Sequence, residues 1–83
     1  MTYAVEPKYE FRNLSEAAVL AALENPTDPT NVIAVEIGRL ILNYLAYFRQ
    51  HSRLPGGNVE GRCPIEQVAM KLTFKAISEN EPR

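Results

Sequence analysis

The segment from residue 31 to residue 53, NVIAVEIGRLILNYLAYFRQHSR, is the longest run of uninterrupted helical periodicity in this 83-residue chain. Asp28 and Pro29 before it are typical of a helix start, with Asp28 as the N-cap and Pro29 in the first turn. The run Pro55-Gly56-Gly57 after it is typical of a helix end. The sequence therefore predicts a helix over 29–53, which would be about 37 Å long at 1.5 Å per residue.

Apolar side chains cover more of this predicted helix than one core-facing stripe requires. One broad face carries Ile33, Ile37, Leu40, Ile41, Tyr44, Leu45 and Phe48. A second, smaller face carries Val35, Leu42 and Ala46, with Ala34 and Gly38 between the two faces. A surface helix normally buries a single stripe. We therefore expect either the central helix of the domain or a helix with one face in an oligomer interface.

The segments before this helix also carry recognisable signals. Residues 1–12 hold Pro7 and alternate aromatic or apolar positions, which predicts an extended arm. Asn13 and Glu16 resemble a capping box, and Asn25-Pro26 stops helical periodicity, so a short helix is predicted over 14–24.

A final helix is predicted over 64–79, with Pro64 in its first turn and residues 54–62 as a hairpin turn before it. Its first apolar stripe runs from Ile65 to Ala76, and a second stripe, nearly opposite, carries Met70, Phe74 and Ile77.

These elements predict one all-α domain over 1–83, built from a short N-terminal helix and a long antiparallel helical hairpin. A domain of this size buries a limited core, and both long helices carry a second apolar face. We therefore expect a homo-oligomer, whose interface consists of Val35, Leu42, Ala46, Met70, Phe74 and Ile77.

Charge is unevenly distributed along the chain, although the net charge is only −1. Residues 1–37 carry two basic and six acidic side chains, whereas residues 38–78 carry six basic and two acidic ones. This asymmetry fits an anionic ligand on the second half or acid-to-base packing between subunits. It equally fits acids near helix starts and bases near helix ends, as helix dipoles favour. General binding to duplex DNA is not expected at this net charge.

Catalytic and metal-binding patterns are weak. His51 is the single histidine and Cys63 the single cysteine, so neither a metal site nor an internal disulfide is expected. Cys63 could act as a thiolate at a helix N-terminus, but a capping or packing role is favoured. We expect no enzyme activity and no cofactor.

Location is predicted from the same sequence. Glu36, Arg39 and Asn43 interrupt the long helix before about 18 apolar residues accumulate, so it does not fit a membrane span. The opening MTYAVEPKYE lacks the blocks of a signal peptide, which predicts a cytoplasmic protein.

A basic cluster is expected around the hairpin turn, where Arg49, Arg53 and Arg62 lie close in sequence to His51. Arginine recognises phosphate through paired hydrogen bonds, and Tyr44, Tyr47 and Phe48 are placed to stack on bases. A solvated helix end beside core aromatics is the favoured explanation for Tyr44 and Phe48, while the role of the arginines stays open.

Two short motifs carry a resemblance to a known family. Phe11-Arg12-Asn13-Leu14-Ser15 near the start, and Met70, Leu72 and Thr73 in the last helix, resemble motifs of small phage proteins with a helical-hairpin domain. Those proteins sequester cyclic oligonucleotide signals of bacterial anti-phage defence. The chain departs from that pattern at Asn25-Pro26, which breaks a helix that is continuous in the family, and at Phe74, where a basic residue is expected.

The resemblance implies a cytoplasmic homo-oligomer that binds a cyclic nucleotide between protomers. The expected ligand-binding residues are Phe11, Arg12, Tyr47, Arg49, Arg53 and Arg62. The alternative is a small helical inhibitor or adaptor that acts by direct protein–protein contact with an acidic partner, as an anti-CRISPR-like inhibitor would.

Overall fold

The computed structural model describes residues 6–54 and 61–80. These residues form a 3-10 turn, η1 (Tyr9–Phe11), and three helices, α1 (Glu16–Ala22), α2 (Val32–His51) and α3 (Pro64–Glu79). No strand occurs within the described ranges. The all-α class predicted from the sequence is therefore confirmed.

The start of each helix is set by a local side chain. The Ser15 hydroxyl accepts a hydrogen bond from the backbone N–H of Ala18 at 3.1 Å, so the N-cap of α1 lies two residues after the expected cap at Asn13. The last helix begins at Pro64, as predicted.

The N-terminus of α2 lies three residues beyond the predicted start at Pro29. The Asn31 side chain accepts from the backbone N–H of Ala34 at 3.1 Å and donates to the Ala22 carbonyl oxygen at 2.6 Å. Asn31 thus caps α2 and fastens it to the end of α1. Asp28 instead accepts from the backbone N–H and the hydroxyl of Thr30, at 2.9 and 2.7 Å.

The end of α2 depends on Ser52, whose φ of 58° is left-handed and whose N–H donates to the Phe48 carbonyl oxygen at 2.7 Å. A left-handed residue directly after the last turn is a common way to stop a helix. Residues 55–57, which were expected to end the helix, lie outside the described ranges.

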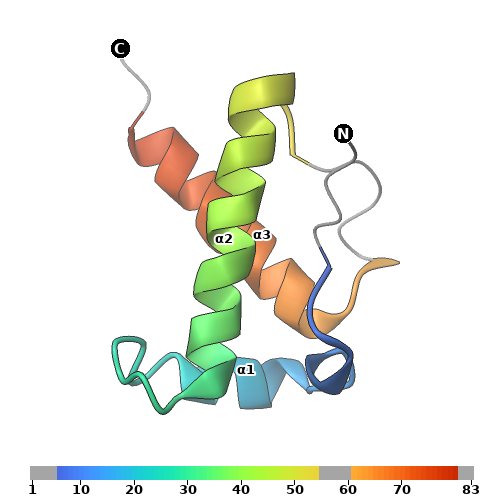
Figure 1. Ribbon diagram of the computed structural model, residues 1–83, viewed down its shortest axis with the longest axis vertical. Helices are drawn as coiled ribbons and strands as arrows, with labels where there is room; N and C mark the ends of the chain where they lie inside the picture. The colour runs from blue at the N-terminus through green and yellow to red at the C-terminus, as the bar shows by residue number, and fades with distance from the viewer. Residues whose placement is uncertain (1–5, 55–60, 81–83) are drawn as a thin grey trace.

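The core lies where the three helices meet. Buried side chains from all of them contact one another there: Val19 from α1; Ile37, Leu40 and Tyr44 from α2; and Ile65, Val68, Ala69 and Met70 from α3. In Figure 1, α1 lies across the lower end of α2, and α1 packs against both longer helices. The expected core face of α2 is therefore the face that is buried.

The predicted antiparallel hairpin is not confirmed. In Figure 1 α2 and α3 both run toward the top of the view, and α3 crosses obliquely behind α2. The two helices pack against each other, but buried positions end at Tyr44 on α2 and Thr73 on α3. The connection over 52–63 can reach about 40 Å when extended, so its length does not force the helices side by side.

The predicted extended arm is partly helical in the described ranges, because η1 interrupts it at Tyr9. Pro7 and Phe11 are buried, and Phe11 belongs to the core. Residues 1–5 lie outside the described ranges.

Candidate functional site

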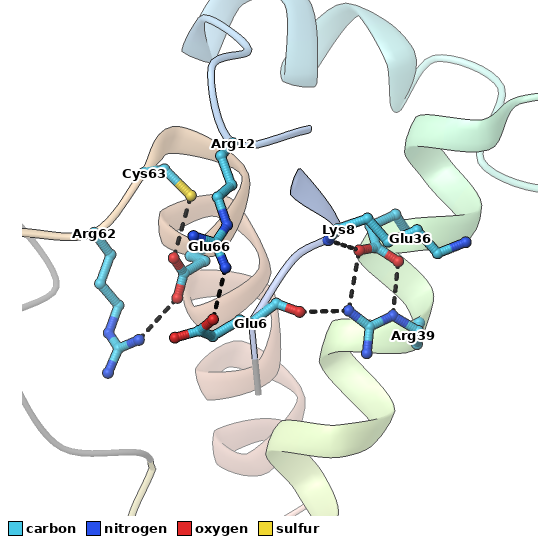
Figure 2. A network of polar contacts seen from close by, with 8 residues as sticks. All are labelled: Glu6, Lys8, Arg12, Glu36, Arg39, Arg62, Cys63 and Glu66. Carbon is cyan, nitrogen blue, oxygen red and sulfur yellow. Dashed lines mark hydrogen bonds and ion pairs between the residues drawn. The ribbon is translucent and has the colours of Figure 1, made fainter. Parts of the chain in front are cut away.

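A polar network joins the N-terminal segment to α2, as Figure 2 shows. The Glu36 carboxylate accepts from the backbone N–H of Lys8 at 2.6 Å and from Nε and Nη2 of Arg39 at 2.7 and 3.0 Å. Arg39 also donates to the Glu6 carbonyl oxygen at 2.6 Å. Each polar group therefore helps to hold the segment around Glu6 and Lys8 against the helix.

Glu36 is charged although it is only 2% exposed. Hydrogen bonds from the Arg39 guanidinium lower the pKa of Glu36, with a smaller contribution from the Lys8 N–H, and they outweigh the opposing effect of burial. The same pair raises the pKa of Arg39. Glu36 therefore acts as a buried anion whose charge is already neutralised by its own chain.

The expected ligand residues of the N-terminal segment are engaged within the chain. Nη2 of Arg12 forms an exposed ion pair with Oε2 of Glu6 at 2.6 Å. The Phe11 ring is enclosed by the core. In this structure Phe11 presents no face for stacking on a base, and a ligand at Arg12 has to compete with Glu6.

A second polar cluster lies at the start of α3, where Glu66 is buried (Figure 2). Its carboxylate accepts from Nη1 of Arg62 at 2.8 Å and from the thiol of Cys63 at 3.2 Å. Gln67 closes the turn by donating to the Arg62 carbonyl oxygen at 2.6 Å. Arg62, an expected ligand residue, is thus paired with a carboxylate in the first turn of α3.

The Cys63 thiol is held in its neutral form. Burial, together with its hydrogen bond to Glu66, raises the pKa of Cys63 above the ordinary value for a thiol. A reactive cysteine needs the opposite shift. Cys63 occupies the N-cap position of α3, but its side chain makes no capping hydrogen bond.

Tyr44 lies between the two polar clusters. Its side chain is fully buried, and within the described ranges its hydroxyl has no hydrogen-bond partner. Burial raises the pKa of Tyr44, and the nearby Glu66 carboxylate adds to the shift. The phenol is therefore neutral at physiological pH, which makes it an unsuitable base.

The three arginines of the expected basic cluster come from the end of α2 and from the residues just before α3. Arg49 and Arg53 are exposed at the end of α2, and no ion pair joins either of them to another described residue. In Figure 1 the end of α2 lies at the top of the view, whereas α3 begins lower and to the right. Arg62 lies just before α3, where it pairs with Glu66 and acts electrostatically on Tyr44 of α2.

Tyr47 lies in the last turns of α2, on a different side of the helix from Arg49. Its ring packs on His51, with the ring centroids 4.3 Å apart and the planes tilted by 39°. The Tyr47–His51 pair therefore occupies one side of the end of α2, and Arg49 another.

Several side chains that were expected in an oligomer interface are exposed on α2. The side chain of Val35 is 56% exposed and that of Leu42 is 69% exposed. Gly38, which lies between them, and Ala46, one turn after Leu42, are half-buried. We call Val35, Gly38, Leu42 and Ala46 the outward face of α2, since they lie opposite the core-facing side. A Cβ atom added at Gly38 would meet nothing within 4 Å, so close approach by another helix of the same chain is not observed there.

The corresponding residues of α3 behave differently from one another. Phe74 is 63% exposed and Ile77 is half-buried, but Met70 is only 3% exposed and belongs to the core. Met70 therefore has no surface to offer a second copy in this structure, because the oblique crossing of α2 and α3 covers it. The second apolar stripe of α3 therefore contributes Met70 to the core and leaves Phe74 exposed.

The sequence interpretation missed the buried role of Glu36, which was counted only among the polar residues that interrupt the long helix. Its three-residue spacing from Arg39 is a signal for an ion pair on one helix face. No local pattern pointed to the hydrogen bond from Lys8, because that contact joins positions 28 residues apart. The exposure of Val32 and Leu20 was also not anticipated.

The described part of the chain contains no group of three or more His, Cys, Asp or Glu side chains that could hold a metal ion. Within the same ranges, none of the helices has the length and apolar character needed to cross a membrane.

Comparison of the chain with protein-family models, with curated proteins and with solved structures finds no match.

Proposed function

We propose that this protein is a non-enzymatic binding protein that acts by protein–protein contact through the outward face of α2. The observation that carries the proposal is the exposure of Val35 and Leu42, seven residues apart, on a helix whose opposite side already fills the core. Burying an apolar side chain of this size stabilises a complex by about 1.5–3 kcal/mol. The outward face therefore offers useful binding energy that the chain itself does not use.

The state of the titratable groups supports a non-enzymatic role. Glu36 and Glu66 are each hydrogen-bonded to an arginine. The pKa of Cys63 and that of Tyr44 are both raised, which keeps the thiol and the phenol neutral. Catalysis by these groups would need a free base or an activated nucleophile. Their arrangement instead suits cohesion of the fold.

A matched pair of variants tests the proposal. Leu42→Glu places a charge on the outward face of α2, whereas Leu20→Glu places one at an exposed position of α1. Both leucines are exposed, so both variants should keep wild-type helical content by circular dichroism. Proteins that cross-link to the wild-type chain in the cells that produce it should be lost with Leu42→Glu and retained with Leu20→Glu.

The opposite pattern would remove the basis of the proposal. If Leu42→Glu retains every cross-linked protein, or if both variants lose the same ones, the outward face of α2 is not the binding surface. Mass spectrometry identifies the cross-linked proteins. It also detects a second copy of this chain, because a cross-link between two copies can join peptides that carry different isotope labels.

A second candidate function is sequestration of a cyclic nucleotide between protomers, as the resemblance to phage sponge proteins implies. The observation that favours it is the pair Arg49 and Arg53, which are exposed and form no ion pair with another described residue. Phe11, Arg12 and Arg62 give it less support, because the first is in the core and the other two pair with carboxylates.

A thermal-shift screen against cyclic di- and trinucleotides tests this second candidate. A ligand that binds only the folded state stabilises it by about 2.7 kcal/mol at 100 times its Kd. The melting temperature should therefore rise with the right nucleotide, and the rise should vanish in an Arg49→Ala, Arg53→Ala double variant. No shift with any nucleotide would leave protein binding as the sole function proposed.

A further inference from the structure

The two ends of α2 carry opposite charge at exposed positions. Glu24 and Asp28 are exposed in the segment that leads into α2, and Arg49 and Arg53 are exposed at its end. Figure 1 places that leading segment at the lower end of α2, far from the end of the helix at the top. The outward face of α2 lies between these two charged regions. Any partner of this face therefore meets negative charge at one end and positive charge at the other.

We propose that the partner is a second copy of this chain, whose α2 packs antiparallel against the outward face of α2. The inference rests on the proposed function, because it takes this face as the binding surface. In the pairing, Val35 contacts the second copy's Leu42. Arg49 and Arg53 lie near the second copy's Asp28 and Glu24, and each contact occurs twice about the two-fold axis.

The register follows from the spacing of the residues. Val35 precedes Gly38 by three residues, and Leu42 follows it by four. A two-fold axis that passes α2 between Gly38 and Arg39 therefore brings Val35 opposite the second copy's Leu42. The same register places the end of α2, with Arg49 and then Arg53, beside the segment that leads into the second copy's α2, which carries Glu24 and Asp28. The apolar contact and the charge contacts thus agree on one arrangement.

Charge distinguishes this arrangement from a parallel one. In a parallel pair Arg49 would face Arg49 and Asp28 would face Asp28, and like charges across an interface are unfavourable. In the antiparallel pair each contact joins opposite charges, and the helix dipoles of the two copies oppose each other favourably. Asp28 is suited to this role because hydrogen bonds from Thr30 lower its pKa and leave further acceptor positions on the carboxylate.

Gly38 suits the point where the two helices cross. Its missing side chain lets the second helix approach closely, and a Cβ at this position would meet nothing within its own chain. The space above Gly38 is therefore open to a neighbouring molecule. A large side chain at position 38 would keep the helices apart.

The mass of the protein in solution gives the first test. Sedimentation equilibrium should report twice the mass of one chain, and the Kd of the dimer should rise with added salt because exposed charge pairs are screened. A monomer at every concentration up to about 100 µM, near the weak end of specific association, would overturn the inference.

Directed disulfide formation tests the register. In a Cys63→Ser background, which removes the native thiol, a Val35→Cys chain is mixed with a Leu42→Cys chain under mild oxidation. A disulfide needs Cα atoms about 4.4–6.8 Å apart. The antiparallel register predicts the mixed disulfide between the two kinds of chain. If the disulfides instead join two chains of the same variant, with little mixed product, the pair is parallel and the inference is overturned.

A charge exchange tests the polar contacts. Arg53→Glu alone and Glu24→Lys alone should each weaken the dimer by about threefold to tenfold, as exposed pairs do when they occur twice. The chain that carries both changes should recover the wild-type Kd, since opposite charges again face each other. Lys71→Glu, at an exposed position of α3, is the control and should leave the Kd unchanged. Failure of the double variant to recover would overturn the proposed charge contacts.

These experiments separate the inference from the proposed function. A monomeric protein whose cross-links to a different protein depend on Leu42 rejects the second copy and keeps the outward face as a binding surface. A dimer that is unaffected by Leu42→Glu rejects both. Dissociation of the dimer by a cyclic nucleotide, lost on Arg49→Ala, would assign these arginines to a ligand instead and overturn their proposed contacts with Asp28 and Glu24.

Discussion

Glu36 binds Arg39 through two hydrogen bonds on one turn of α2, at 2.7 Å from Nε and 3.0 Å from Nη2. The carboxylate is buried, whereas the guanidinium is partly exposed and reaches the Glu6 carbonyl oxygen. This pair is therefore the link between the N-terminal segment and the helix that organises the fold. It also fixes the side of α2 that faces the chain itself.

Glu36→Gln should lower the free energy of unfolding by about 2 kcal/mol, because it removes a charged acceptor of several hydrogen bonds. Glu6→Gln is the control, since among the described residues its side chain forms only the exposed pair with Arg12, and it should cost less than about 1 kcal/mol. Urea unfolding at pH 7 measures both values. Equal losses in the two variants would contradict the structural role assigned to Glu36.

The Glu36 contribution should also depend on pH. Its pKa in the folded state is lowered, so its stabilisation is present above the unfolded pKa of about 4.3. It is lost as the pH falls from there through the folded pKa, where the unfolded chain binds the proton more readily. The wild type should therefore lose stability more steeply than Glu36→Gln below about pH 4.3. Parallel curves in urea titrations would show that the carboxylate does not carry this dependence.

Tyr44→Phe should stabilise the protein by about 1 kcal/mol, because it removes a buried hydroxyl that has no partner among the described residues. Since the pKa of Tyr44 is raised in the folded state, the neutral phenol contributes stability below about pH 10 that is lost at higher pH. The variant should therefore resist alkaline unfolding better than the wild type. Tyr9→Phe changes an exposed ring and should match the wild type in both measurements.

Cys63 should react slowly with a disulfide reagent at pH 8, compared with a free cysteine, because its pKa is raised by burial and by Glu66. Glu66→Gln removes the neighbouring negative charge, so a larger fraction of Cys63 is thiolate. The reaction rate should increase in proportion to that fraction. Glu79→Gln, at the other end of α3, should leave the rate unchanged. A rate in the wild type equal to that of free cysteine would show that the thiol is not protected.

Gly38→Ala should stabilise the single chain by up to about 1 kcal/mol, since alanine favours a helix and its Cβ has open space. Gly38→Leu should leave the fold of one chain intact but weaken self-association. Ala34→Leu is the control, because it overfills a buried position of α2 and should cost about 1–3 kcal/mol. Unfolding measured at several protein concentrations separates the two effects. If Gly38→Leu lowers the free energy of unfolding of the single chain as much as Ala34→Leu does, position 38 is packed within the chain.

Local chemistry in the sequence determined the helical elements. Pro64 set the start of the last helix, and the spacing of Ile37, Leu40 and Tyr44 identified the core face of α2. These predictions succeeded because helical periodicity and proline geometry act within a few residues. Asn31 caps α2 in place of the expected Asp28, because its amide also donates to Ala22 in another helix, and no neighbouring residue signals that contact.

The tertiary structure alone decided how these elements meet. It buried Glu36 beside Lys8, enclosed Met70 in the core, and paired Arg62 with the buried Glu66. Each of these outcomes depends on contacts between different segments of the fold, most of which join side chains far apart in the chain. A sequence pattern shows which faces of a helix need cover, whereas the packing of side chains from different helices decides which face the chain covers itself and which it leaves to a partner.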